Sequence, residues 1–403
     1  LDIWSGSRIS HFLDVNPNGQ WIRKSLLGVD TQLLSKPLLL SLCRESIGQI
    51  QYNWGESAHV PRKLDQSIQR TLGGQAAFVV GESGVGKTVA CVKTVVAHLD
   101  ADGAGIVVTH EALELCRTIA QAVEFELRRL CPSLESGAAA AALALGSPSM
   151  PLIVLIEDIN RSPDPGFLLD RLVGWIKDTA DKAEAARSNW FLICPLWPKT
   201  LLLASDITRK RIEGMVTVAL PFTDAEANEA LHSKAKIDGH EMSPLDVEAI
   251  ARSLGNDPLL ISLYEWQQST EPHAVIDAFV GNQLQRLSSQ STTTLTDFRE
   301  TLAAFGKHLL IHKATSPTWP QVRDWFSEKP ALIAILQVIL EDRQVVRLID
   351  NGATERLAFR HDRIEFSVLA HAVTTLADAT QLTDEIAGDP FYAEVIGLSL
   401  SKW

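Results

Sequence analysis

The sequence predicts an α/β fold with a parallel sheet, followed by a mainly helical region. Between residues 59 and 222, short apolar runs alternate with helical patterns, as in sheets whose parallel strands are joined by helices. After Pro221 the strand patterns stop, apart from one pair near the end of the chain. The 403 residues, 46% of them hydrophobic, are enough for two or three packed domains.

Composition narrows the class of protein. The 37 Lys and Arg residues against 49 Asp and Glu give a net charge of -12, which disfavours a protein whose main task is to neutralise nucleic-acid phosphates. The five cysteines contain no CxxC pair, so we expect a reducing cytoplasm rather than a disulfide framework or a zinc site. No run approaches the roughly 18 apolar residues of a membrane span.

The beginning of the chain has no clear core of its own. It starts at Leu1 without Met and without a signal pattern, so we expect part of a longer protein. Within residues 1–58, a helix is expected from Ser35, with Pro37 in its first turn.

Five strands are expected in the α/β region, because short apolar runs flanked by turns are typical of sheets covered on both faces. They are residues 76–80, 105–109, 152–157, 190–194 and 215–220. The segment 134–151, rich in Ala, Gly, Ser and Pro, is interpreted as a surface excursion before the third strand.

After Pro221, three helices are expected, since each begins with a capping residue or a first-turn proline: one from Thr223 to Lys236, one from Ser243 to Leu254 and one from Pro258 to about Gln268. A longer helical stretch covers residues 273–310. The rest, to residue 370, predicts two helices, a hairpin around Asn351-Gly352 with strands at 345–349 and 356–359, and a further helix. Helices with one hairpin are the outline of a winged helix.

The stretch GESGVGKT, residues 81–88, lies directly between the first expected strand and a helix. It matches GxxxxGK[ST], in which glycines let backbone N–H groups converge on phosphate oxygens at the positive end of a helix. Lys87 is expected to reach the β and γ phosphates, and Thr88 to bind Mg²⁺. A surface glycine turn is the alternative. The predicted fold class is therefore an α/β P-loop NTPase domain with a parallel sheet, followed by a small helical domain and a winged-helix domain.

An acidic pair ends the most apolar strand of the chain. In PLIVLIEDINR, Glu157 and Asp158 are placed to order Mg²⁺ through water, and with Lys87 they are the candidate catalytic residues. Alternation along a strand sends the two carboxylates to opposite faces, which leaves open which of them faces the metal. A merely solvated strand end is the other interpretation.

Three more stretches have weaker signals. SAHVPRKLDQSI is compatible with Val60 and Arg62 lying near an adenine, or with an ordinary domain-entry turn. In LGNDPLL, Gly255 can end one helix and Pro258 can open the next. In LAFRHDR, His361 lies between a strand and a helix, where a lone histidine is more often a cap or a core residue than a ligand.

These stretches, in this order, resemble the STAND class of P-loop ATPases, the signal-transduction ATPases that include NACHT and NB-ARC proteins. The resemblance runs from about Ala58 to Ala372. GESGVGKT and LIVLIEDIN resemble the Walker A and Walker B motifs, LGNDPLL the Gly-x-Pro motif, and FRHDR the winged-helix His-Asp motif. The resemblance implies that Pro258 packs against the adenine or ribose and that His361 touches the β-phosphate of ADP.

The resemblance also implies a complete ligand set for ATP or ADP with Mg²⁺. The metal would be held by Thr88, Glu157 and Asp158. The nucleotide would be held by Val60, Arg62, Gly81, Glu82, Ser83, Gly84, Val85, Gly86, Lys87, Thr88, Val89, Pro258 and His361. Two features depart from the family: Glu157 replaces the usual Asp, and Cys194, Pro195 and Trp197 stand where many relatives carry a polar sensor.

The implied division resembles the core of bacterial antiviral STAND proteins. It consists of a connector after an absent N-terminal effector (1–58), a nucleotide-binding domain (59–222), a helical lid (223–312), a winged helix (313–380) and the start of a C-terminal repeat or sensor region (381–403).

Three functions remain open from the sequence. The favoured one is a cytoplasmic ATP/ADP switch, closed with ADP and opening to self-associate on activation, with slow or absent hydrolysis. Its rival is an AAA-type ATPase acting on DNA, although residues 313–365 carry eight Lys and Arg against eight Asp and Glu, a neutral composition that disfavours a groove reader. A small-molecule kinase is the third, and the long helical region has no evident use there.

Overall fold

The computed structural model describes most of the chain. The described residues are 32–51, 60–72, 74–157, 159–162, 164–182, 189–266, 269–350, 355–389 and 392–401, with 9, 12, 13, 19 and 22. By packing, the chain forms two compact units, one of Leu1–Glu56 and Pro61–Leu220, the other of Ser57–Val60 and Pro221–Trp403. None of the helices described is long and apolar enough to cross a membrane.

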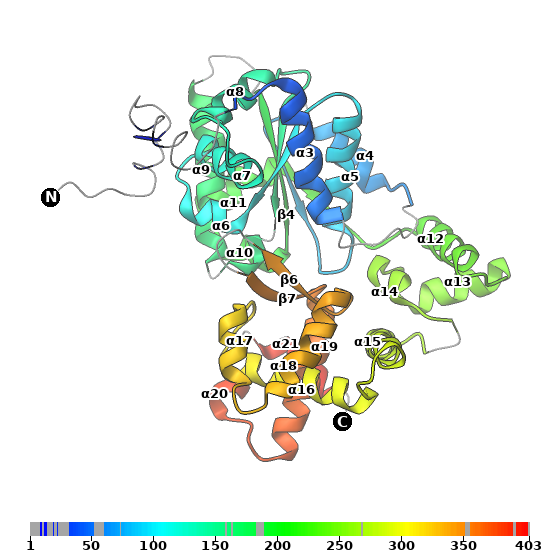
Figure 1. Cartoon of the computed structure of the whole chain (residues 1–403). Helices are drawn as coiled ribbons and strands as arrows, with labels where there is room; N and C mark the ends of the chain where they lie inside the picture. Colours follow the sequence, from blue (N-terminus) through cyan, green and yellow to red (C-terminus); the bar gives the residue numbers. More distant parts are fainter. Residues whose placement is uncertain are drawn as a thin grey trace. The chain divides into compact units, whose positions relative to one another are not determined.

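The first unit is built on a five-stranded parallel sheet in the order β2-β3-β4-β1-β5 (Figure 1). The strands are β1 Ala76–Val80, β2 Gly105–Thr109, β3 Leu152–Glu157, β4 Trp190–Leu196 and β5 Val216–Val218. The parallel sheet predicted from the sequence is confirmed. The fifth strand is shorter than predicted, because Glu213–Met215 form a 3-10 helix in front of it.

The central strand β4 separates the strand that precedes the glycine-rich loop from the strand that ends in Glu157. Its Pro195 would normally disrupt a central strand, since proline lacks the N–H of a ladder bond. The pairing of β3 with β4 ends at Leu155↔Ile193, however, so at Pro195 only β1 is paired. The carboxyl end of β4 therefore behaves as an edge.

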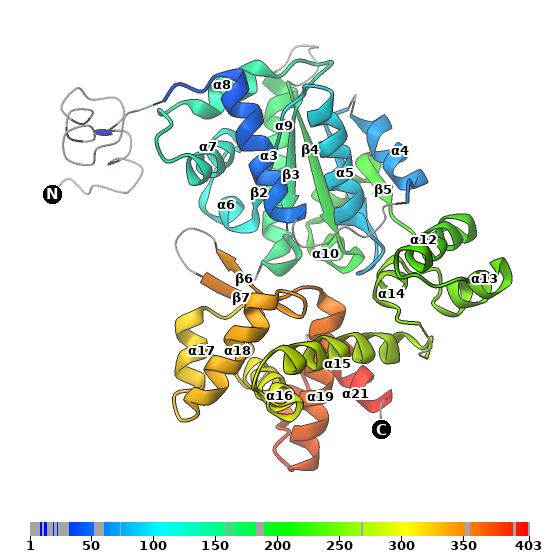
Figure 2. The ribbon, with the colours of Figure 1, turned by 45° about the vertical axis from the view of Figure 1, so that its right-hand side comes forward.

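Helices cover both faces of the sheet. α3 (Lys36–Gln51) and α5 (Lys87–Asp100) lie on one side, and α9 (Pro165–Lys182) lies on the other (Figures 1 and 2). The predicted start near Ser35 is confirmed, since its carbonyl accepts the Leu39 N–H at 2.9 Å. α3 contributes Leu39, Cys43 and Ile47 to the core of the first unit, so it shares that core. The other helices are α4 Lys63–Thr71, α6 His110–Leu115, α7 Ile119–Leu130, α8 Ala138–Leu145, α10 Pro198–Leu203 and α11 Asp206–Ile212.

The interpretation of residues 134–151 as a surface excursion is wrong in part. Residues 138–145 form α8, and Ala138, Ala139 and Ala142 are buried in the core of the first unit. An alanine-rich run is both strongly helix-forming and small enough to pack closely, and this outweighs the flanking turn residues.

The second unit is helical apart from one hairpin, and its first part is formed by α12 Asp224–Ile237, α13 Pro244–Ser253, α14 Pro258–Leu263 and α15 Pro272–Gln290. The capping box predicted at Thr223 is confirmed. α14 is shorter than predicted, because the backbone turns extended at Tyr264. The predicted helical stretch over 273–310 is two helices, because Thr294 caps a new one after a Ser- and Thr-rich break.

The later part of this unit has the order expected of a winged helix: α16 Leu295–Ile311, α17 Trp319–Trp325, α18 Pro330–Asp342, β6 Val346–Asp350, β7 Glu355–Phe359 and α19 Asp362–Asp378. The predicted antiparallel hairpin is confirmed, with pairing from Val346↔Phe359 to Asp350↔Glu355. The predicted turn at Asn351-Gly352 lies outside the described residues. After α20 (Asp384–Ala387), α21 (Ala393–Ser401) packs against α19.

Candidate functional site

The glycine-rich loop lies where the sequence places it, between β1 and α5. Gly84 and Gly86 have φ values of 90° and 83°, in the left-handed region that glycine adopts without strain. Left-handed residues within a short loop turn the backbone N–H groups around them toward a common centre, and α5 adds its positive end. The loop thus has the backbone geometry of a phosphate cradle.

Gly81 anchors the start of the loop to two neighbouring strands. Its N–H donates to the carbonyl of Leu196 at the end of β4, at 3.2 Å. A Cβ on Gly81 would lie 2.4 Å from the carbonyl oxygen of Ala219, closer than real Cβ contacts come. A side chain here would displace either the loop or the segment after β5.

Lys87 is the first residue of α5 and is only 7% exposed. Its Nζ donates to the backbone carbonyl of Glu82 at 2.7 Å, so the ammonium lies within the loop. A phosphate oxygen in the cradle would offer a stronger, charge-assisted acceptor than this carbonyl. Among the other predicted contacts, Glu82 is exposed, Val85 is buried, and Ser83, Thr88 and Val89 are half-buried.

Arg62 braces the loop from the preceding segment. Its guanidinium donates to the carbonyl of Val85 at 2.6 Å and to that of Leu220 at 2.7 Å. Its backbone N–H donates to the Asp65 carboxylate at 2.8 Å, and this hydrogen bond caps the start of α4. These bonds make Arg62 a support of the loop. A direct nucleotide contact by Arg62 or by the buried Val60 stays a prediction.

Glu157 is half-buried at the end of β3, paired in register with Thr109 of β2. Asp158 lies outside the described residues. No cluster of three or more His, Cys, Asp or Glu side chains suited to a metal occurs among the residues that the structure describes. Mg²⁺ bound with a nucleotide needs only one or two protein oxygens besides phosphate and water, so the Thr88 hydroxyl and the Glu157 carboxylate are a fitting donor set.

A residue that the sequence did not single out connects the ends of β3 and β4. Asn160 accepts the N–H of Trp197 at 3.0 Å and the hydroxyl of Thr200 at 2.7 Å through the same oxygen. Cys194 is fully buried, and burial raises the pKa of its thiol well above the usual value. It is therefore a core residue and not a reactive thiol.

In the second unit, the structure brings together two motifs that are far apart in the sequence. Pro258 is the first residue of α14, and His361 caps the start of α19. Arg363 of α19 forms an ion pair with Asp257, the residue before Pro258, at 2.7 Å. The capping role anticipated for a lone histidine is confirmed, whereas Asp257 and Arg363 were not anticipated.

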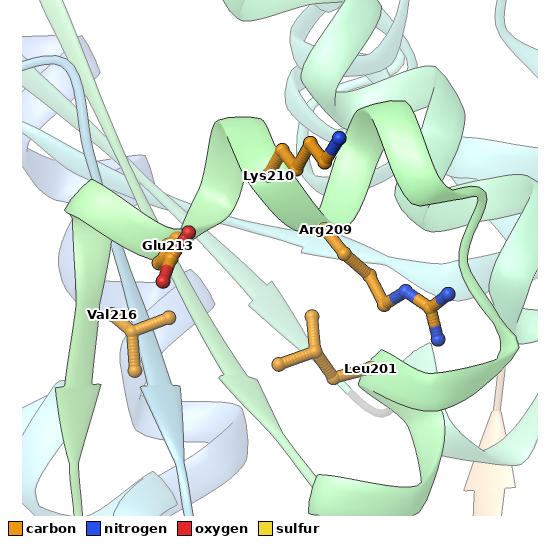
Figure 3. Close-up of a pocket in the computed structure, with 5 residues that line it drawn as sticks. All are labelled: Leu201, Arg209, Lys210, Glu213 and Val216. Atoms are coloured by element: carbon orange, nitrogen blue, oxygen red, sulfur yellow. The ribbon is translucent and has the colours of Figure 1, made fainter.

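A cavity of about 340 Å³ lies elsewhere in the first unit (Figure 3). Its lining comes from α10, α11, the 3-10 helix and β5: Leu201, Arg209, Lys210, Glu213 and Val216. None of these residues belongs to the predicted ligand set.

Comparison with known proteins finds no matching family model and no matching curated protein. Solved structures that resemble the chain include a Walker-type ATPase of Pyrococcus abyssi, at 13% identity over 77% of this chain and 96% of that one, with a TM-score of 0.38. The Aeropyrum pernix ORC2 protein is 12% identical over 81% and 98%, with a TM-score of 0.37. Domain III of Thermotoga maritima DnaA is 15% identical over 51% and 82%, with a TM-score of 0.34. All three likenesses are distant and concern the fold alone.

Proposed function

We propose that the chain is an ATP/ADP-binding switch of the STAND type, closed with ADP and opening to self-associate on activation. In a bacterial defence or signalling protein it would be the regulatory core between an effector and a sensor. The observation that supports this most is the phosphate cradle, with its left-handed Gly84 and Gly86 and with Lys87 at the start of α5.

Each predicted ligand has a defined task in this proposal. The N–H groups of the loop and the Lys87 ammonium bind the β and γ phosphates, and Thr88 with Glu157 and Asp158 holds Mg²⁺, which offsets phosphate charge when bound. Pro258 packs against the adenine or ribose, and His361 donates a hydrogen bond to the β-phosphate of ADP. Lys87, Glu157 and Asp158 are the proposed residues for a slow hydrolysis that resets the switch.

The switch works through differential affinity. A ligand shifts an equilibrium between two forms only by the difference between its binding free energies to them. In the proposal, ADP binds the closed form more tightly because His361 contacts the β-phosphate, whereas the γ-phosphate of ATP reduces that preference. Exchange of ADP for ATP then favours the open form.

Assembly measured against bound nucleotide tests the proposal. Protein loaded with ADP is expected to elute as a monomer in size-exclusion chromatography with light scattering, and protein loaded with ATP and Mg²⁺ is expected to form larger species. The Lys87→Ala variant, which lacks the phosphate contact, should show no nucleotide-dependent change. The same mass for wild-type protein in ADP and in ATP would speak against a nucleotide-driven switch.

One observation favours the second candidate, an ATPase that acts on DNA. Arg347 of β6 and Arg356 of β7 lie on the same face of the hairpin, since Arg347 pairs with Ala358 and side chains alternate along a strand. Arg360 continues this face, and burial together with the nearby charge of Arg347 lowers the pKa of its guanidinium. Glu355 falls on the opposite face by the same alternation. One face of the hairpin is therefore positively charged, although the region as a whole has as many acidic as basic residues.

Salt-dependent binding of a labelled DNA duplex distinguishes the two candidates. The DNA-acting ATPase predicts binding that weakens steeply with salt and that the double variant Arg347→Ala/Arg356→Ala reduces. The switch predicts no DNA binding beyond that of this double variant.

A further inference from the structure

One ion pair links the two motifs of the second unit that the proposed function assigns to nucleotide. A guanidinium nitrogen of Arg363 lies 2.7 Å from a carboxylate oxygen of Asp257. Asp257 directly precedes Pro258, and Arg363 lies two residues after His361. The contact therefore relates the start of α14 to the start of α19.

Asp257 uses both of its carboxylate oxygens. Oδ1 accepts the backbone N–H groups of Leu259 at 2.9 Å and Leu260 at 3.1 Å, which caps α14. Oδ2 faces Arg363. The residue is 8% exposed, so its charge is largely withdrawn from water. The same side chain therefore caps α14 beside Pro258 and connects the start of this helix to Arg363 of α19.

The backbone of Arg363 also determines which ring nitrogen of His361 accepts a hydrogen bond. The backbone N–H of Arg363 donates to Nδ1 of His361 at 3.2 Å. A ring nitrogen that accepts a hydrogen bond carries no proton, so in this arrangement Nε2 is the ring nitrogen that can carry an N–H. His361 thus presents an N–H donor from Nε2, which is the group needed to bind a phosphate oxygen.

We propose that Asp257 and Arg363 are positioning residues that hold Pro258 and His361 in the arrangement able to bind ADP, and that opening of the switch separates this ion pair. The inference rests on the proposed function and adds the element that couples the two motifs. Neither residue needs to touch the nucleotide. The pair acts through the residues beside it, since a shift of α14 against α19 would move Pro258 away from His361.

The burial of the pair makes it suited to two discrete states. The Arg363 and Asp257 side chains are 26% and 12% exposed, so intermediate separations would leave charges poorly solvated and unpaired. Either the contact is made, or both groups are fully hydrated after a larger movement. A half-broken pair is the least favourable arrangement.

The test compares ADP and ATP affinities of wild-type protein with those of Asp257→Asn and Arg363→Gln. Asparagine is itself a good helix cap, so the first variant retains the start of α14 and loses only the charge. Each variant is expected to bind ADP about 10-fold more weakly, as for the loss of a hydrogen bond between charged groups, and ATP less affected. The double variant should be no weaker than either single variant, because the two residues act as one pair.

Two further variants separate positioning from general damage. Arg363→Lys keeps the charge and should restore part of the ADP affinity, which a purely steric role would not produce. Arg252→Gln breaks the exposed ion pair between Arg252 and Glu248 on α13 and should leave both affinities unchanged.

The outcomes distinguish the inference from the proposed function. If wild-type protein binds no nucleotide, both are wrong. If wild-type protein binds ADP, Lys87→Ala does not, and Asp257→Asn and Arg363→Gln keep the wild-type ratio of ADP to ATP affinity, the inference alone is overturned. A lowered ADP affinity in both variants, with partial rescue by lysine, supports it.

Discussion

The two units of the molecule build their candidate ligand contacts in different ways. In the first unit the contacts come from one continuous loop of eight residues, Gly81 to Thr88, supported by backbone carbonyls around it. In the second unit the two predicted contacts, Pro258 and His361, belong to different helices and are related by side chains, Asp257 and Arg363.

This difference bears on what each unit can do. A loop fixed by its own backbone between a strand and a helix retains its shape when distant parts of the chain move. A pair of contacts related by one ion pair is lost when that pair separates. The first unit is therefore suited to bind phosphate in either state of a switch, and the second unit to bind in only one state.

The largest expected effect is in the first unit. Lys87→Ala should weaken ATP and ADP alike by about 100-fold, since the ammonium makes charge-assisted bonds to the phosphates in both states. Isothermal titration with each nucleotide measures this. The matched control is Lys93→Ala, which removes a lysine from the same helix outside the loop. Unchanged affinity in Lys87→Ala would contradict the proposal that the loop binds the phosphates.

The corresponding change in the second unit should discriminate between nucleotides. His361→Ala is expected to weaken ADP about 10-fold and ATP by less, and to favour assembly, because the Nε2 donor is needed only in the closed form. Competition with a fluorescent nucleotide gives both constants. His371→Ala, an exposed histidine of the same helix, serves as the control. Equal losses for ADP and ATP would mean that the units do not differ as proposed.

The close approach of Gly81 to a neighbouring segment should also affect the stability of the first unit. Gly81→Ala should lower the free energy of unfolding by about 1–3 kcal/mol, because its Cβ would meet the Ala219 carbonyl and force a shift. Gly174→Ala, in α9 with no atom within 4 Å of the added Cβ, should instead raise it by about 0.5–1 kcal/mol. Urea titrations followed by circular dichroism measure both. A neutral Gly81→Ala would show that the loop does not need this close approach.

The smallest expected effect is a loss of folding stability at low pH, caused by a histidine of the second unit. Burial, and then the nearby charge of His312, lower the pKa of His308, which stacks on Trp325 with ring centroids 5.7 Å apart. The unfolded chain therefore takes up this proton first, so stability is full above the ordinary value of 6.5 and is lost as the pH falls below it. Melting temperatures at about pH 7.5 and 5.5 should differ less for His308→Gln than for wild-type protein. An identical pH dependence in both would show that His308 does not titrate in this way.

Features that depend on local sequence could be predicted. The apolar runs of the sheet, the loop GESGVGKT, the cap at Thr223 and the helix start near Ser35 are each specified within a few neighbouring residues. They were therefore placed almost to the residue. The boundaries that were wrong, at β5 and α14, lie where the chain makes a 3-10 turn or extends against buried neighbours.

Contacts that join distant segments could not be predicted in the same way. Arg62 bonds to the carbonyls of Val85 and Leu220, and backbone carbonyls leave no mark in a sequence. Asp257 and Arg363 are ordinary charged residues in the sequence, and only the fold shows that their side chains meet. An Asp before a helix-opening proline was the one available signal, and it predicts a cap rather than an ion pair.

The proposed switch holds ADP in its resting state. Its most direct test is the nucleotide content of the purified protein, released by denaturation and separated by ion-exchange chromatography beside ADP and ATP standards. Wild-type protein is expected to release ADP in an amount close to one per chain, and Lys87→Ala prepared in parallel is expected to release none. An empty wild-type protein that binds and turns over ATP freely would contradict the proposed resting state.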